Sequence, residues 1–160
     1  MLNLLRVLLD ILRFRASPRA VPYSVTFLLV FLVLNVLLKL VDFQVYAHGL
    51  ILLALTFGWL ALFVFVCLWL GHKRDRFVQT YSAILGTLLI TNALFRLFTL
   101  CIPAPIMQWV FWVFLVWNLA VLSHIMRYAL DTKVRYAVLL VLSFEVVRFG
   151  LLWFAVGVIA

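Results

Sequence analysis

The sequence is poor in charged residues, and acidic residues are the scarcest of all. Only 11% of the 160 residues are charged, and Asp and Glu together number five. Soluble domains carry about 25% charged residues, which keep their surfaces in water. A chain of this length has too small an interior to hide the 69% of its residues that are hydrophobic. A water-soluble globular domain is therefore excluded, and we expect lipid to surround most of the chain.

Cysteine is almost absent, and the two positions where it occurs argue against a disulfide framework. Cys67 and Cys101 are expected near opposite faces of a bilayer, whereas a disulfide needs Cα atoms within about 7 Å of each other. Neither cysteine belongs to a CxxC pair or a Cys/His cluster, and the histidines His48, His72 and His124 show no spacing that suits a metal. We therefore expect no metal site and no cofactor.

The common catalytic motifs are missing as well. The chain contains no Walker-type phosphate loop, no HExxH or GxSxG motif and no pair of carboxylates placed to face water. A membrane-embedded enzyme would need a second carboxylate or a histidine at the depth of Glu145, and the sequence places neither there. The prediction is therefore that the protein is not an enzyme.

Long hydrophobic runs are what the chain has in abundance, and its mean hydropathy is +1.27. Five runs approach the 20 or so residues that cross about 30 Å of hydrocarbon as a helix. We predict an all-α fold, in which residues 1–160 form a single membrane domain with five transmembrane helices. The predicted spans are about 21–41, 50–70, 80–100, 106–128 and 136–159.

A short amphipathic helix is predicted ahead of the first run, over residues 1–14. Asn3, Arg6, Asp10 and Arg13 recur at spacings of three and four residues, which puts them on one polar stripe while leucines fill the rest. Such a helix suits the membrane interface. A cleaved signal peptide fits less well, because charged residues interrupt the apolar region and no small-residue cleavage site follows.

The chain is basic, with a net charge of +8. Its Lys and Arg residues lie in short segments beside the hydrophobic runs, which is the pattern of the positive-inside rule, and they form no single patch for nucleic acid. Anionic lipid headgroups are the expected counter-charge. The residues that we expect to contact lipid or a protein partner are Arg6, Arg13, Arg15, Lys73, Arg74 and Arg76.

The distribution of these cations predicts an orientation. The N-terminal segment, the turn at 71–76 and the turn at 131–135 hold most of them, whereas the other side of the predicted bilayer has Lys39 and at most Arg96 and Arg148. By the positive-inside rule the N-terminus is cytoplasmic and, after five spans, the C-terminus is outside.

Polar residues inside the predicted spans are the candidates for function, because burying an ionised group in lipid costs several kcal/mol or more. Glu145 and Arg148 are three residues apart and so are neighbours on a helix surface. Counting along each span puts Glu145 and three asparagines at a similar depth. The predicted intramembrane polar cluster consists of Asn35, Lys39, Asn92, Arg96, Asn118, Glu145 and Arg148.

This cluster has two interpretations. It could be a site in which Glu145 is the acid, balanced by Arg148 or Arg96, and which relays protons or holds a polar lipid headgroup. It could instead be structural, and this is the favoured reading. Glu145 and Arg148 would then neutralise each other, the asparagines would bond between helices, and the other cations would reach outward to the interface.

Small residues gather in the third run. They allow helix backbones to approach closely, so the stripe predicts a packing seam with another span or another copy of the chain, and a ligand groove is the alternative. The stripe consists of Thr80, Thr87 and Thr91, with Ser82, Ala83 and Gly86 beside it.

The start of the third run reads Arg76-Phe77-Val78-Gln79-Thr80-Tyr81-Ser82-Ala83-Ile84-Leu85-Gly86, and Pro18 and Pro22 precede the first run. With the arginine-bearing N-terminal helix and five closely spaced runs, this layout resembles that of the Yip1-type membrane proteins, especially their small bacterial members. The resemblance implies a non-enzymatic integral membrane protein that binds partners or organises membrane, here in the inner membrane of a bacterium.

We therefore predict a non-catalytic scaffold, accessory or membrane-organising subunit. Its expected partners are membrane lipids with anionic headgroups, together with a protein partner or further copies of the chain. The alternative is a small transporter or a proton or ion permeation subunit that uses the polar site around Glu145. Loss of proton-coupled flux in a Glu145→Gln variant would distinguish the transporter from the scaffold.

Overall fold

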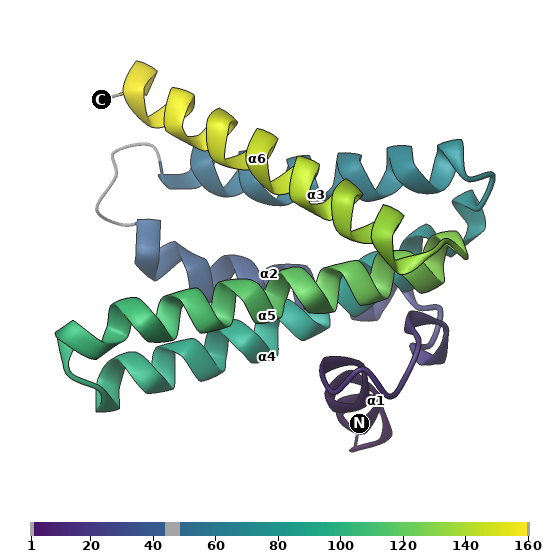
Figure 1. Cartoon of the computed structure of the whole chain (residues 1–160), viewed down its shortest axis with the longest axis horizontal. Coiled ribbons are helices and arrows are strands. Elements are labelled where there is room, and N and C mark those ends of the chain that lie inside the picture. Colours follow the sequence, from purple (N-terminus) through teal and green to yellow (C-terminus); the bar gives the residue numbers. More distant parts are fainter. Residues whose placement is uncertain (1, 44–48, 160) are drawn as a thin grey trace.

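The computed structural model describes residues 2–43 and 49–159, and over these residues it is helical and contains no strand (Figure 1). This confirms the predicted all-α fold and the short helix ahead of the long ones. The predicted second loop, which includes His48, lies outside the described residues. The elements are α1 (Leu2–Leu12), the short 3-10 helix η1 (Pro18–Ala20), α2 (Val25–Phe43), α3 (Gly49–Leu70), the 3-10 helix η2 (Arg74–Arg76), α4 (Phe77–Cys101), α5 (Ala104–Leu130) and α6 (Val134–Ile159).

Among the described residues, four stretches are long and apolar enough to cross a membrane: Gly49–Leu70, Arg74–Cys101, Pro105–Leu130 and Val134–Ala155. They correspond to the second to fifth predicted spans. The first predicted span, 21–41, is represented by α2, whose 19 residues measure about 28 Å. The apolar stretch of α2, Val25–Leu40, is shorter than the other four, so the fifth crossing stays a prediction.

The helix α2 begins at Val25, four residues later than the sequence indicated. Pro18 opens the separate 3-10 turn η1, and the chain is extended at Val21, where φ is −75° and ψ is 129°. Pro22 explains this, because the ring of a proline disfavours helical geometry in the residue before it. The prolines therefore separate α1 from the bundle by a short irregular segment.

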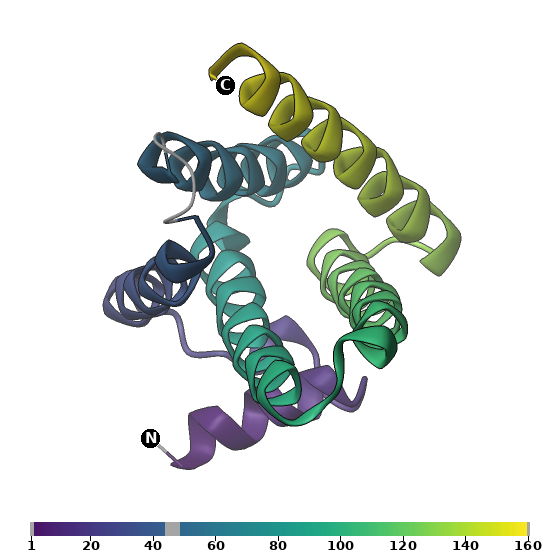
Figure 2. The same cartoon turned by 90° about the vertical axis from the view of Figure 1, so that its left-hand side faces the viewer.

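The helices α2 to α6 run back and forth between two ends of a bundle (Figure 1). We call the end on the right of Figure 1 the basic end; it holds η1, the α3–α4 turn with η2, and the α5–α6 turn at Asp131–Lys133. The other end holds the end of α2, the start of α3 and the α4–α5 connection. Figure 2 looks along the bundle and shows α4 near its centre, with α2 and α3 on one side and α5 on the other.

The helix α4 is central because its small residues let its neighbours approach from all sides. Every residue from Thr80 to Thr87 is buried, which is more than two helical turns without an exposed face. At Gly86 an added Cβ would lie 2.8 Å from Leu8 Cδ2 and 3.2 Å from Phe31 Cε2, so glycine permits α1 and α2 to rest on α4 there. The small-residue stripe is thus a packing seam within the chain.

The outer surface of the bundle is apolar. Large hydrophobic side chains stay exposed on every long helix, among them Leu62 at 52%, Val146 at 72% and Trp153 at 85%. A bundle in water could not leave so much apolar surface uncovered. Lipid is the solvent that fits this surface, as expected for a membrane protein.

The helix α1 lies across the bundle near the basic end; Figure 1 shows it end-on and Figure 2 lengthwise. Its apolar side, with Leu8, Ile11 and Leu12, is buried, while Arg6 and Arg13 are exposed. The predicted polar stripe therefore faces away from the bundle, which suits a helix at the membrane interface.

Candidate functional site

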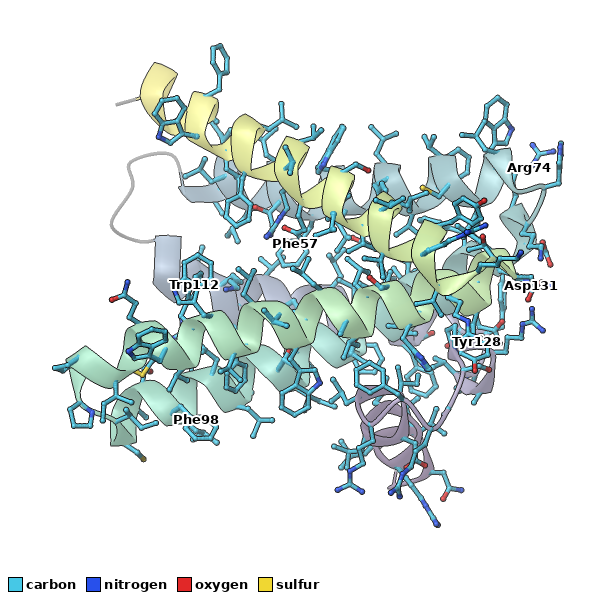
Figure 3. All side chains as sticks on the ribbon, viewed as in Figure 1. Phe57, Arg74, Phe98, Trp112, Tyr128 and Asp131 are labelled. Carbon is cyan, nitrogen blue, oxygen red and sulfur yellow. The ribbon has the colours of Figure 1, made fainter. Side chains whose placement is uncertain are left out.

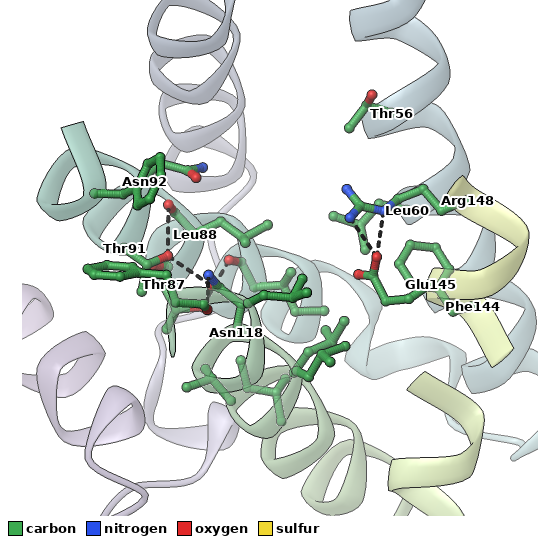
Figure 4. A pocket seen from close by; sticks show the side chains of 18 of the residues that line it. Thr56, Leu60, Thr87, Leu88, Thr91, Asn92, Asn118, Phe144, Glu145 and Arg148 are labelled. Carbon is green, nitrogen blue, oxygen red and sulfur yellow. Dashed lines mark hydrogen bonds and ion pairs between the residues drawn. The ribbon is translucent and has the colours of Figure 1, made fainter. Parts of the chain in front are cut away.

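A cavity of about 220 Å³ lies inside the bundle, among α3, α4, α5 and α6 (Figure 4). Aromatic and aliphatic side chains such as Phe57, Leu60, Phe114 and Phe144 form most of its wall. Polar groups reach it from several helices, and they are Lys39, Thr56, Thr87, Thr91, Asn92, Asn118, Glu145 and Arg148. This combination of an apolar wall with a few convergent polar groups is typical of small-ligand sites.

The helix α6 contributes an ion pair to the cavity. Arg148 Nε donates a hydrogen bond to Glu145 Oε2 at 2.7 Å, across the i to i+3 spacing that the sequence predicted. The side chains are largely buried, with 16% of Glu145 and 26% of Arg148 exposed. The two charges compensate each other, which removes most of the cost of placing either of them between helices.

The opposite wall carries a neutral polar pair between α4 and α5. The Thr91 hydroxyl donates to Asn118 Oδ1 at 3.0 Å, and Asn118 Nδ2 donates to the Phe114 carbonyl oxygen at 2.9 Å (Figure 4). The residues Asn118 and Thr91 thus lie on one side of the cavity and the Glu145–Arg148 pair on the other. A polar ligand between them would find a carboxylate, a guanidinium and an amide.

The predicted polar cluster divides into two parts. Five of its seven residues, Lys39, Asn92, Asn118, Glu145 and Arg148, line the cavity. Asn35 is fully buried between α2 and α4, where its Nδ2 donates to the carbonyl oxygens of Phe31 and Leu85, both at 2.8 Å. Arg96 Nη2 donates to the Leu38 carbonyl oxygen at 2.8 Å, again from α4 to α2. These last two residues join helices. The structural interpretation proposed this for Asn35, whereas it expected Arg96 to reach outward to the interface.

The sequence analysis kept a ligand groove only as the alternative for the threonine stripe and did not connect the stripe with the polar cluster. Thr87 and Thr91 were assigned to the small-residue stripe, and that stripe turns out to have two sides. Gly86 faces α1 and α2, whereas Thr87 and Thr91 face the cavity. Thr56 on α3 gave no signal at all, because a lone threonine in an apolar run most often bonds to its own helix, here to the Leu52 carbonyl oxygen at 2.8 Å.

A second polar site lies at the basic end, around Asp131. This residue ends α5 in the left-handed region, with φ of 54° and ψ of 43°. Its carboxylate accepts hydrogen bonds from Arg19 and Lys73 and, at 3.0 Å, from Arg76 Nη1. The hydrogen bonds from Lys73 and Arg76, and then the charge of Arg19, hold the pKa of the Asp131 carboxyl well below its usual range. We call these four residues the Asp131 cluster.

The Asp131 cluster joins three segments that are far apart in the sequence. Arg76 also donates to the Ala129 carbonyl oxygen at 3.1 Å, and Gln79 donates to the Val21 carbonyl oxygen at 2.7 Å. Lys73 and Arg76, predicted to contact lipid or a partner, are therefore engaged within the chain. Arg74 is exposed and points away from the bundle (Figure 3). The sequence marked Asp131 as a turn residue but gave no sign of its partners.

The segment after α1 is fixed to α5. Trp117 Nε1 donates to the Leu12 carbonyl oxygen at 3.3 Å, and His124 Nε2 lies 3.0 Å from the Ala16 carbonyl oxygen. The ring of Phe14, whose φ is 60°, meets the His124 ring edge-on with centroids 5.3 Å apart. His124 thus has a role in attaching the N-terminal segment.

Within the described part of the chain, no group of three or more His, Cys, Asp or Glu side chains could hold a metal ion. Cys67 and Cys101 are both free thiols. Comparisons with known protein families, with characterised proteins and with solved structures find no match for this chain. The resemblance to the Yip1-type family therefore stays a prediction from the sequence.

Proposed function

We propose that the chain is a non-catalytic integral membrane protein that acts as a scaffold, accessory or membrane-organising subunit. We place it in the inner membrane of a bacterium, with the N-terminus and the basic end in the cytoplasm and the C-terminus outside. The positive-inside rule supports this orientation, since the exposed cations outside the Asp131 cluster lie at the basic end or on the N-terminal segment beside it. They are Arg6, Arg13, Arg15, Arg74, Arg127, Lys133 and Arg135.

The observation that carries the proposal is the fixed basic surface around the Asp131 cluster. By holding η1 and two turns together, Asp131 also fixes the positions of the exposed cations on and beside these turns, which are Arg74, Arg127, Lys133 and Arg135. Among the described residues, Asp75 is the other acid at this end. A rigid array of cations with little opposing acid suits anionic headgroups and the acidic surface of a partner protein.

Site-specific cross-linking in native membranes tests the scaffold proposal. A photoreactive residue replaces His72 in the turn of the basic end, and in a control chain it replaces Trp109, which is exposed at the other end. We expect a protein adduct of defined mass from position 72, and we expect the charge reversals Arg74→Glu and Lys133→Glu together to remove it. The same adducts from both positions, or an adduct indifferent to charge reversal, would contradict the proposal.

A small transporter or permeation subunit is the second candidate, and the cavity is the observation that favours it. The cavity contains a titratable acid, Glu145, next to a cation and facing the amide of Asn118. In vesicles that contain the purified protein and a trapped pH-sensitive dye, a transporter would carry protons, and Glu145→Gln would abolish that flux. Ser143→Ala, an exposed position on the same helix, serves as the control. Wild-type flux no greater than that of protein-free vesicles would exclude this candidate.

The same Glu145→Gln variant separates the two functions. A scaffold should keep the adduct from position 72 and its abundance in the membrane, because Glu145 lines the internal cavity, eleven residues from the start of α6 at the basic end. Loss of the adduct with an intact fold would instead connect the cavity to partner binding.

A further inference from the structure

An apolar groove with a basic rim lies on the outside of the bundle, between the end of α1 and the middle of α5. Its volume is about 720 Å³, and it is open along its length. On one side are Arg13 and Arg15 with Phe14 between them, and on the other are Trp112, Val116 and Trp117. This groove is separate from the internal cavity, with which it shares no residue.

The walls of the groove are held in place by contacts within the chain. Trp117 Nε1 donates to the Leu12 carbonyl oxygen at 3.3 Å, and the Phe14 ring packs edge-on against His124. The N-terminal segment therefore has a fixed position on α5. A groove with fixed walls binds a ligand without first ordering the protein, and this lowers the entropic cost of binding.

The position of the groove along α5 restricts its occupant. Trp117 lies thirteen residues before Leu130, about 20 Å from the basic end of the helix, and Trp112 lies about 8 Å further. The helix α5 has 27 residues, so in a chain that spans the bilayer Trp117 lies near the middle of the hydrocarbon and Trp112 beyond it. The segment with Arg13 and Arg15 lies closer to the cytoplasm, between the levels of Trp117 and His124 on α5, and its arginine side chains are long enough to reach toward the headgroups. Membrane lipids reach this surface directly, and water-soluble ligands do not.

The charges of the groove point to an anion. Arg13 and Arg15 are exposed, and neither forms an ion pair among the described residues. Of the described acids, Asp131 and Glu145 are already paired with cations of this chain. A second copy of the chain would therefore bring a charge of +8 but few free carboxylates to these arginines. Guanidinium groups bind phosphate through two parallel hydrogen bonds, which makes phosphate the anion that suits them best.

We propose that this groove binds one anionic phospholipid of the cytoplasmic leaflet. The lipid phosphate lies against Arg13 and Arg15, and an acyl chain follows α5 over Trp117, Val116 and Trp112 into the middle of the bilayer. The proposal rests on insertion of the chain in a membrane but not on a scaffold role, because the groove is distinct from the basic surface.

Native mass spectrometry of the full chain in mild detergent tests the proposal. The protein is titrated with phosphatidylglycerol and with phosphatidylcholine of the same acyl chains, and glycerol 3-phosphate is added as a headgroup without chains. We expect one phosphatidylglycerol per chain, held at least tenfold more tightly than phosphatidylcholine, and no displacement by an equal concentration of glycerol 3-phosphate. Equal retention of both lipids would overturn the proposal, as would displacement by glycerol 3-phosphate.

Three variants locate the lipid. Arg13→Gln with Arg15→Gln should lower phosphatidylglycerol binding at least tenfold, whereas Val146→Trp, a bulky change at an exposed position of α6 outside the groove, should leave it unchanged. Ala120→Trp should fill the groove and remove the bound lipid while all arginines stay. Ala120→Trp also tests whether lipid occupies the groove if the arginine variant fails to fold. Lipid binding that survives both groove variants, or a dimer that Ala120→Trp dissociates, would show that no lipid occupies this groove.

Discussion

The contact between Gly86 on α4 and Leu8 on α1 leads to a sharp prediction about how the N-terminal helix is held. A Cβ added at Gly86 would lie 2.8 and 2.9 Å from the two methyl carbons of Leu8, well inside the usual contact distance of about 3.4 to 4 Å. Leu8 is itself 3% exposed, so it has little room to turn away. Alanine at position 86 must therefore push α1 outward.

Two opposing effects decide the stability of Gly86→Ala. Alanine in place of glycine inside a helix gains about 1 kcal/mol of helix propensity, while overpacking a close contact costs about 1 to 3 kcal/mol. We therefore expect the variant to range from unchanged to about 2 kcal/mol less stable. In a Leu8→Ala background the clashing methyl groups are gone. Only Phe31 Cε2, 3.2 Å from the new Cβ, then needs to shift slightly, and the same substitution should stabilise by up to about 1 kcal/mol.

A double-mutant cycle measures whether the effect of Gly86→Ala on the unfolding free energy changes sign when Leu8 is replaced. Unfolding of the four proteins in detergent can be followed with a dye that becomes fluorescent on reacting with the half-buried thiol of Cys67, in a Cys101→Ser background because Cys101 is already exposed in the folded protein. A coupling energy of about 1 to 3 kcal/mol between positions 8 and 86 is expected, the size of the overpacking that Leu8→Ala relieves. Additive effects, or stabilisation by Gly86→Ala in the wild-type background, would mean that α1 does not rest on α4 at this glycine.

Three further predictions concern the polar groups. Asp131→Asn should lower the thermal midpoint of unfolding at neutral pH. Because the folded protein lowers the pKa of this carboxyl below its ordinary 3.8, the difference from wild type should persist above about pH 4 and should shrink as the pH falls further. A series of thermal unfolding scans at different pH values measures this difference. Asn35→Leu should change the unfolding free energy by less than about 1 kcal/mol, since it removes two hydrogen bonds but also the buried Oδ1, which has no hydrogen-bond partner among the described residues. Arg148→Met should destabilise by up to about 3 kcal/mol, and adding Glu145→Gln should recover most of this loss, because the unpaired carboxylate carries the cost.

The fold could be predicted from the sequence because one physical requirement dominates it. A chain with so many apolar residues must satisfy its backbone within helices in lipid, and the lengths of its apolar runs then set the lengths of the helices. The start of α2 was predicted four residues too early, since hydropathy does not take into account the backbone restriction that Pro22 imposes on Val21. Which helices pack against each other could not be predicted either, because all faces of these helices are largely apolar and no pattern marks which face meets which neighbour.

For the candidate site, the sequence could predict only how deep each polar residue lies in the membrane. Counting residues placed the asparagines and Glu145 in one layer, but the rotation of each helix decided which of them meet. Asn118 and Glu145 face the same cavity, while Asn35 on α2 turns toward Leu85 instead. Asp131 shows the same limit at the basic end, where a turn residue with a left-handed backbone pairs with Arg19 from one segment and with Lys73 and Arg76 from another, and the sequence indicates neither partner segment.

The position of the cavity within the bundle helps to decide between the scaffold and the transporter. Its lining residues nearest the basic end, Ile84 and Ile125, lie five to seven residues inside α4 and α5, so that about 8 to 10 Å of packed helix separates it from that end. Beyond this layer the Asp131 cluster holds the turns together with three ion pairs. A proton path from Glu145 to this end would have to cross the layer of helix between the cavity and the turns, whereas a scaffold needs only that the ion pairs stay formed. The geometry of the basic end therefore favours the scaffold, because the ion pairs fix the surface offered to a partner.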